Sequence, residues 1–248
     1  MSNQLKLNAE KSHLLTLGTK ERLNNLSISV SVKMDGVELK EDISKQELLL
    51  GCKISSDLKW LKQVDHLKLK LKKRLVGLSH LRHIAHFKTK KEMAGGIFQS
   101  VLSYCLPLFG GCERNKLKEL QVLQNSAARI VCNAHWKTPR RVLLDKIGWL
   151  SVYQLVVFQT LTMVFSIRRN GEPEYLAKHL KDFGRRNRVR RSNTRLSLAL
   201  HSFTFRGAKL WNDLPCDIRS CQRPSEFKKL AETWILKNIP KFVDELPT

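Results

Sequence analysis

The chain has 248 residues, of which 42% are hydrophobic, so it can build one or two domains with a buried core. Lysine and arginine number 45 against 22 aspartates and glutamates, which gives a formal net charge of +23. Such a charge is typical of proteins that bind a polyanion. Nucleic acid is the first candidate, and an anionic membrane surface, the ribosome or chromatin are alternatives.

The N-terminus gives no indication of export, because residues 1–10 contain no apolar signal core. The six cysteines are scattered along a chain too large to need disulfides, which predicts reduced thiols inside a cell. Cys216 and Cys221 lie near each other, but no neighbouring pair of histidines or cysteines completes a zinc set. We expect an intracellular protein, nuclear or cytoplasmic, that is not secreted and holds no metal.

Residues 1–61 are predicted to form a small α+β piece. Apolar residues alternate with period two over 27–32, which is the spacing of a strand. A turn signal, Asp-Gly at 35–36, and a second short strand at 37–39 complete a predicted hairpin. A further strand is expected at residues 48–50.

Helical periodicity begins at residue 62 and predicts a bundle of three helices over 62–133. The first helix carries an apolar stripe among many lysines. The second, at 89–106, is weakened by the glycines at 95–96, and the third covers 115–131. The stripe of the first helix consists of Leu67, Leu71, Leu75, Leu78, Leu81 and Ala85.

Residues 134–183 are expected to form a helical connector. Pro139 and Gly148 are predicted to bound one helix. The next stretch, 147–167, is uncharged and long enough to span a membrane, but polar residues interrupt it. Its larger apolar residues share one helical face, which favours a core helix buried on one side over a membrane span. These residues are Leu155, Phe158, Leu161 and Phe165.

Residues 184–248 are expected to be a basic loop and a C-terminal helical region. Six arginines and no acid occupy 184–195, which is typical of a loop. Apolar residues alternate imperfectly over 198–205, and 227–236 has the pattern of an amphipathic helix. Trp211 to Pro215 is interpreted as a helix end in which Trp packs, Asn or Asp caps and Pro stops. The predicted fold class is mainly α with a small N-terminal α+β piece.

Three stretches of the chain carry a resemblance to a known family. They are LKLNAEKS at 5–12 running on to Gly18, LLGCKI at 49–54 with DLKW at 57–60, and the set SYC, LQVLQNSAAR and LWNDLP at 103–105, 120–129 and 210–215. In this order they resemble the end of the palm, the primer grip, and the thumb and tail of LINE-type (non-LTR, jockey-like) retrotransposon reverse transcriptases.

The resemblance covers only the C-terminal part of these enzymes. It implies the end of the palm with a primer-grip-like hairpin at 1–61, a helical thumb at 62–133, a connector at 134–183 and a tail at 184–248. The parent enzymes are RNA-directed DNA polymerases whose paired aspartates hold Mg²⁺. No adjacent pair of aspartates occurs in this sequence. We therefore expect no catalytic residue and no cofactor, and Lys11, which matches a lysine near the incoming nucleotide's phosphates, would be vestigial.

The leading hypothesis is a truncated reverse-transcriptase fragment that binds RNA or an RNA/DNA duplex without synthesis. It takes no small-molecule substrate, and its oligomeric state stays open. One alternative is an RNA-directed DNA polymerase of a mobile element that is active only with the missing palm and fingers. A weaker alternative is a membrane-associated protein that uses residues 147–167.

The residues expected to contact nucleic acid fall into three groups, each with a structural alternative. Gly51 would let a tight turn rest on a primer backbone, and Trp60 could stack on a base, or the two could belong to a plain strand and the core. The stretch 59–91 has eleven basic residues and one acid, Asp65, and would follow a duplex or be a solvated face. The arginine cluster would bind backbone or be a nuclear-localisation signal or linker. The residues are Gly51, Lys53, Trp60, Lys68, Lys70, Lys72, Lys73, Arg74, Arg185, Arg186, Arg188, Arg190, Arg191 and Arg195.

Overall fold

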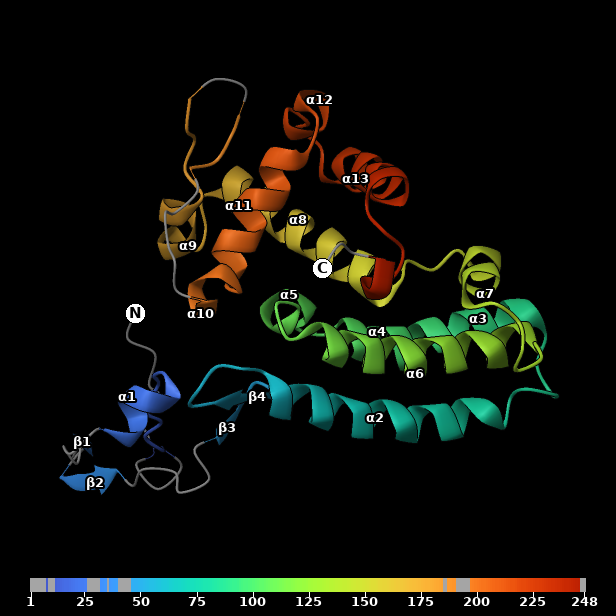
Figure 1. Ribbon diagram of the computed structural model, residues 1–248, viewed down its shortest axis with the longest axis horizontal. Coiled ribbons are helices and arrows are strands. Elements are labelled where there is room, and N and C mark those ends of the chain that lie inside the picture. The colour runs from blue at the N-terminus through green and yellow to red at the C-terminus, as the bar shows by residue number, and fades with distance from the viewer. Residues whose placement is uncertain are drawn as a thin grey trace. The chain divides into compact units, whose positions relative to one another are not determined.

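The computed structural model describes residue 8 and residues 12–25, 32–34, 36–39, 46–184, 187–190 and 197–245. The chain divides into two compact units, Met1–Gln63 and Val64–Thr248 (Figure 1). The predicted fold class, mainly α with a small N-terminal α+β piece, is confirmed. Residues on both sides of the expected boundaries at 133 and 183 belong to one unit, because helices from all three regions pack on α8 (Val152–Asn170).

The N-terminal unit contains one short helix and two β-hairpins in its described part. Helix α1 (Lys20–Asn24) begins after Thr19, whose Oγ1 accepts a hydrogen bond from the backbone N of Arg22. Strands β1 (Val32–Met34) and β2 (Val37–Leu39) pair antiparallel across a turn that contains Gly36 at φ +80°. This is the predicted first hairpin, although residues 27–31 of its first strand lie outside the described residues.

The second hairpin joins β3 (Gln46–Leu49) to β4 (Cys52–Ser55). Leu49 pairs with Cys52, so the loop consists of Leu50 and Gly51 alone. Both residues are left-handed, with φ +48° and +79°. Two positive φ angles in a two-residue loop match the twist of the paired strands, and glycine adopts that conformation at no steric cost. The predicted tight turn at Gly51 is therefore confirmed, whereas the strand expected at 48–50 was placed wrongly, because it covers Gln46–Leu49 and Leu50 belongs to the loop.

Helix α2 (Leu61–Ser79) buries the first part of the predicted stripe. Leu67, Leu71 and Leu78 are buried, but Leu75 is only half-buried. The helix ends at Ser79, so the predicted continuation of the stripe to Leu81 and Ala85 lies in the following turns.

The second predicted helix is interrupted at its glycines. Helix α3 (Phe87–Ala94) runs into a π-helical segment, η2 (Gly95–Gln99), and then into α4 (Ser100–Ser103). A π turn inserts one extra residue into the helical ladder, and it forms where the backbone is weakly held, as at two successive glycines. Cys105 at φ +55° separates α4 from the short helix α5 (Leu106–Phe109).

Helix α6 (Arg114–Cys132) buries Leu117, Leu120 and Ala127 of the apolar face expected from its spacing, whereas Leu123 and Ile130 of that face are only half-buried, and it also buries two glutamines. Gln121 Oε1 accepts a hydrogen bond from the backbone N of Val152 at 2.9 Å, and Gln124 Nε2 donates to the backbone O of Leu150 at 2.9 Å. The first bond satisfies an N–H at the start of α8 that the helix itself leaves without a partner, and the second holds the carbonyl of the residue before the N-cap Ser151. Helix α7 (Arg140–Ile147) lies between α6 and α8 in the sequence and is bounded by Pro139 and Gly148, as predicted.

Helix α8 lies between α11 (Phe203–Asp213) and α13 (Pro224–Asn238) on one side and α5 and α6 on the other (Figure 1). The expected core helix is confirmed, but its expected single apolar face is wrong. Leu161 and Phe165 are buried, whereas Leu155 and Phe158 are only half-buried, and a second set of residues is buried as well. The helix is covered from two sides, which a one-faced pattern does not anticipate. The additional buried residues are Val152, Gln154, Val156, Val157, Thr160, Val164 and Ile167.

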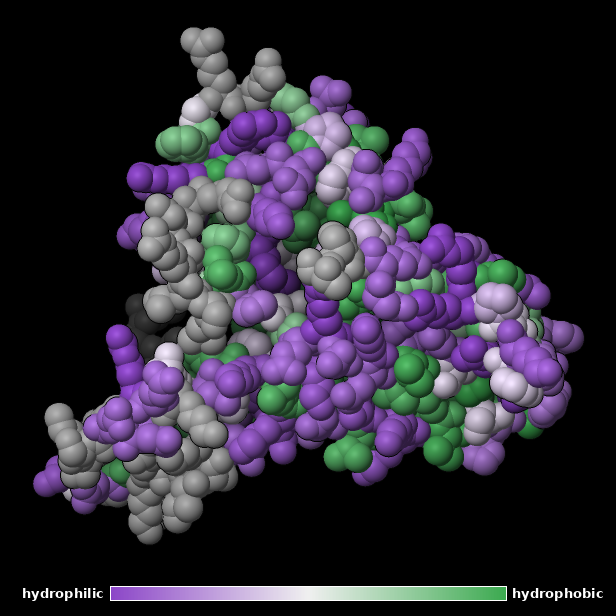
Figure 2. Space-filling model, viewed as in Figure 1, coloured by the Kyte–Doolittle hydropathy of each residue, from purple (hydrophilic) through white to green (hydrophobic). Residues whose placement is uncertain are grey.

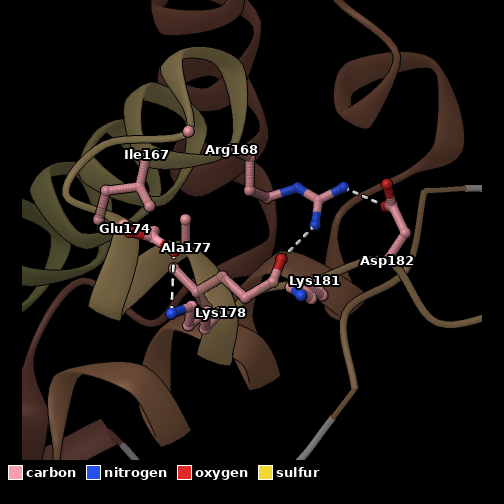
Figure 3. Close-up of a pocket in the computed structure, with 9 residues that line it drawn as sticks. Ile167, Arg168, Glu174, Ala177, Lys178, Lys181 and Asp182 are labelled. Atoms are coloured by element: carbon pink, nitrogen blue, oxygen red, sulfur yellow. Dashed lines mark hydrogen bonds and ion pairs between the residues drawn. The ribbon is translucent and has the colours of Figure 1, made fainter.

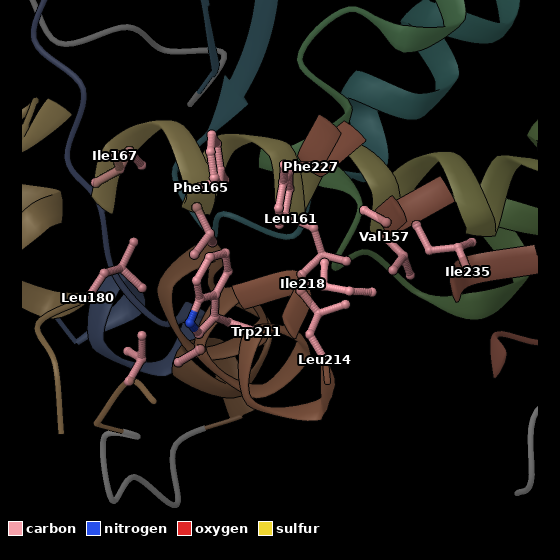
Figure 4. Packing of buried hydrophobic residues seen from close by; sticks show 14 residues of the cluster. Val157, Leu161, Phe165, Ile167, Leu180, Trp211, Leu214, Ile218, Phe227 and Ile235 are labelled. Atoms are coloured by element: carbon pink, nitrogen blue, oxygen red, sulfur yellow. The ribbon is translucent and has the colours of Figure 1, made fainter. Parts of the chain in front are cut away.

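The C-terminal region is helical, and the imperfect alternation at 198–205 forms no strand. Residues 198–205 contain most of α10 (Ser197–Leu200) and the start of α11. Ser202 caps α11, since its side chain accepts a hydrogen bond from Phe205 N. The other elements are α9 (Glu174–His179), α12 (Cys216–Arg219) and η3 (Val243–Glu245). Trp211 is 2% exposed and, with Phe227 and Leu161, belongs to a core that joins α8, α11 and α13 (Figure 4).

Among the described residues, no single helix has both the length and the apolar character needed to cross a membrane. Helices α7 and α8 satisfy that test only as a pair, and they are bent by 43° at the break between them.

Candidate nucleic-acid interface

The hairpin of the N-terminal unit presents an apolar tip. Leu48 and Leu49 are more than half exposed, and Leu50 is 83% exposed. Lys53 is half-buried, and its backbone N donates a 2.7 Å hydrogen bond to Oε1 of the buried Gln63. The turn expected to rest on a primer therefore carries leucine side chains, with Lys53 two residues beyond Gly51.

Trp60 follows a strained turn. Asp57 Oδ1 accepts hydrogen bonds from Ser55 Oγ at 2.6 Å and from the backbone N of Lys59 at 3.2 Å. Burial raises the pKa of Asp57, but these hydrogen bonds outweigh it and hold the pKa below its ordinary value. Leu58 and Trp60 are left-handed, with φ +52° and +61°. Trp60 is half-buried, so its exposure is that of neither a fully buried core residue nor a fully exposed stacking platform.

Lys68 is not available to a ligand in the way the sequence suggested. Its Nζ binds Glu119 of α6 and lies 3.5 Å from Asp65, and Lys116 of α6 lies 3.2 Å from Asp65 and 3.3 Å from Glu119. The bond to Glu119 raises the pKa of Lys68 and lowers that of Glu119. Two cations and two acids neutralise one another, so this cluster contributes no net charge and instead attaches α2 to α6.

The other predicted cations of α2 are exposed. Lys70, Lys73 and Arg74 have the i, i+3, i+4 spacing that places side chains on one helical face. No ion pair or hydrogen bond involves these side chains or that of Lys72 in the described part of the chain. Figure 2 shows that the region of the second unit where α2 lies is largely hydrophilic, with scattered hydrophobic residues. The exposed set is Lys70, Lys72, Lys73 and Arg74.

The arginine cluster is described only at 187–190, where Arg188 and Arg190 are exposed. Their backbone is held in place by the end of α11. Asn212 Oδ1 accepts a 2.8 Å hydrogen bond from Val189 N, and its Nδ2 donates a 2.8 Å bond to Val189 O. Trp211 Nε1 donates to Asn187 O at 2.8 Å. The predicted packing of Trp211 is confirmed, but Asn212 binds the arginine loop instead of capping its helix.

Arg168, near the end of α8, binds the segment at 180–182 that pairs with the same loop. Its guanidinium donates to Leu180 O at 2.6 Å, binds Asp182, and lies 5.0 Å from the centre of the Trp211 ring (Figure 3). Asp182 in turn forms a β-bridge with Val189. The adjoining cavity of about 290 Å³ is lined by both signs of charge, including Glu174 paired with Lys178 at 2.9 Å. This balance makes the cavity a poor site for a phosphate, and Arg168 serves the fold.

Several predicted residues fall outside the described part of the chain. They are Lys11, Arg185, Arg186, Arg191 and Arg195. Within the described ranges, no group of three or more histidine, cysteine, aspartate or glutamate side chains could hold a metal ion.

Two features of this surface were missed by the sequence interpretation. One is the role of Asn212, which only its contact with Val189 reveals. The other is Trp136, which lies in the loop between α6 and α7 and is 71% exposed. Its neighbours His135 and Lys137 are polar, and a Trp between two polar residues was the available signal.

Comparison of the chain with protein-family models, with curated proteins and with solved structures finds no match.

Proposed function

We propose that this chain binds the phosphate backbone of RNA or of an RNA/DNA duplex through the exposed face of α2, assisted by the loop at 187–190. The observation that carries the proposal is the division of the cations on α2. Lys68 is neutralised by acids of α2 and α6, while Lys70, Lys73 and Arg74 share one exposed face that carries no ion pair in its described surroundings, and Lys72 is exposed one turn from Lys68.

An ordinary solvated helix face mixes both signs of charge, because like charges at i, i+3 and i, i+4 disfavour the helix. Lys70, Lys73 and Arg74 have this unfavourable spacing. A bound polyanion would offset this repulsion, because each cation would then lie near a negatively charged phosphate. A helix of 19 residues is also a rigid rod about 28 Å long, which suits an extended backbone better than a small ligand.

The proposed origin is the C-terminal part of a LINE-type reverse transcriptase. The tight turn at Leu50 and Gly51 and the Asp57 turn before Trp60 support it, since both lie in the stretch that resembles the primer grip. The proposal includes binding and no synthesis. A primer-extension reaction with Mg²⁺ and nucleotides is expected to give no product, and incorporation that a chelator abolishes would contradict it.

The binding proposal is tested by the salt dependence of affinity for an RNA/DNA duplex. Each phosphate contact contributes about 0.9 to the slope of log K against log salt concentration. Replacing Lys70, Lys72, Lys73 and Arg74 by alanine is therefore expected to reduce that slope by about 2 to 4.

The matched control removes four other exposed lysines and lowers the net charge equally. These are Lys209, Lys228, Lys229 and Lys237 on α11 and α13. We expect the control to lose less than half as much slope. An equal loss in both variants would mean that net charge alone is measured, and an unchanged slope in the α2 variant would remove the helix from the interface.

A further inference from the structure

Trp136 is an exposed aromatic ring on the loop 133–139. It is 71% exposed, and the described ring contacts are with its sequence neighbours alone. His135 lies 5.7 Å away at a tilt of 39°, and Lys137 Nζ lies 5.3 Å from the ring centre. Neither neighbour buries the ring, so its surface is accessible to a flat, apolar ligand group.

The loop that carries Trp136 is fixed at its beginning. Asn133 is left-handed at φ +50° and ends α6, and Ala134 N donates a 3.0 Å hydrogen bond to Arg129 O. Arg82, from the turn after α2, donates to Asn133 Oδ1 at 3.2 Å and to Ala134 O at 3.0 Å. A ligand that stacks on this ring therefore meets a held loop, and little conformational entropy is lost on binding.

Helices α3, α6 and α7 lie together at one end of the unit (Figure 1), and exposed lysines occur on α3, on α7 and on the loop that carries Trp136. Lys137, Lys88, Lys91 and Lys146 are exposed on that loop and on α3 and α7, and the buried Lys90 of α3 donates to Arg82 O in the turn after α2 at 3.0 Å. Of the acids on α3 and α7, Asp145 is paired with Lys241, which leaves Glu92 as the one acid of α3. Lys137, beside the ring, supplies a positive charge of the kind that an anionic ligand requires.

We propose that Trp136 is a stacking site for one base of single-stranded RNA or DNA, with Lys137 at the adjoining phosphate. The proposal rests on the proposed function and extends it to a second surface that takes unpaired nucleotides. Every base has a π face, and an aromatic ring beside a cation binds single strands with little sequence preference. In a duplex the bases are already stacked on one another, so the duplex gains nothing from this ring.

The test measures the affinity of the full chain for a fluorescent oligouridylate of about 12 nucleotides, a length that one such site covers. Trp136→Ala is expected to weaken binding by about 5- to 100-fold, as loss of one stacked base does. Trp136→Phe keeps a ring and is expected to retain most of the affinity. Binding of a blunt RNA/DNA duplex is expected to be unchanged in both variants.

Tyr175→Ala is the matched control, because Tyr175 is 68% exposed but lies on α9. If Trp136→Ala binds oligouridylate as the unmodified chain does, the stacking site is refuted while duplex binding by α2 still stands. If it weakens single-strand and duplex binding equally, the ring has no preference for unpaired bases, and the proposal is again overturned. Trp136-dependent binding to phosphatidylserine vesicles without an effect on oligouridylate would assign the ring to a membrane surface instead.

Discussion

Replacing Asn212 by alanine removes both hydrogen bonds that hold Val189 in the arginine loop. The amide of Asn212 pairs with the N–H and the C=O of Val189 at 2.8 Å each. Val189 is 2% exposed, so its backbone groups have no easy access to water in the closed loop. The substitution leaves every arginine of the loop in place.

The cost of this change follows from the two bonds. Each contributes about 1 kcal/mol net, and leaving buried partners unsatisfied would add more if the loop stayed closed. The loop avoids that penalty by opening to water, which limits the loss to about 2 kcal/mol. A shift of this size makes the open form of the loop about 30-fold more populated.

Limited trypsin digestion measures the opening directly, because Arg188 and Arg190 are cleavage sites within the held segment. When opening and closing are faster than cleavage, the rate follows the population of the open loop, so Asn212→Ala is expected to be cut about 30-fold faster after these residues. Asp213→Ala, at the next and exposed position, is the control and is expected to be cut at the original rate. Equal rates for Asn212→Ala and the unmodified chain would refute the idea that Asn212 holds the loop.

Two other expectations concern stability. A Cβ at Gly207 would lie 2.8 Å from Cγ2 of the buried Val164, so Gly207→Ala is expected to lower the free energy of unfolding in urea by about 1–2 kcal/mol. Gly77→Ala, on the open face of α2, is expected to raise that free energy by about 0.5 kcal/mol. Equal effects of the two substitutions would contradict the close packing of α8 on α11. The bond to Lys68 holds the pKa of Glu119 below its ordinary 4.5, so this carboxylate stabilises the fold above that pH, and the contribution is lost as the pH falls through the lowered value. Glu119→Gln is therefore expected to show a shallower loss of urea stability below pH 4.5 than the unmodified chain, and parallel curves would contradict the ion-pair network.

Much of the helical framework follows from local signals in the sequence. Pro139 and Gly148 bound α7, and Gly95-Gly96 marks the place where the second helix changes to a π turn. A turn at Gly51 was also indicated, because glycine adopts positive φ angles at no steric cost, whereas the positive φ of Leu50 had no such signal. These features depend on backbone conformations that particular residues favour or forbid, so a few neighbouring residues are enough to indicate them.

Contacts between distant segments were not predictable in the same way. The lysines of α2 look alike in sequence, yet Lys68 faces Glu119 across 51 positions and the exposed cations do not. The apolar pattern of α8 predicted one buried face. Two faces are buried, because helices that precede α8 in the sequence and helices that follow it both pack on it. Asn212 or Asp213 was expected to cap the end of its own helix, but Asn212 binds Val189, which lies 23 positions earlier.

The sequence by itself determined that this protein is strongly basic, mainly helical and punctuated by glycine and proline at identifiable breaks. Only the tertiary structure decided which cations are neutralised and which remain exposed. The reason is physical: a charge is the same wherever it lies along the chain, but its effect depends on the partners that folding brings within a few ångströms. Lys68 and Lys70 differ in that respect alone, and on that difference the proposed interface depends.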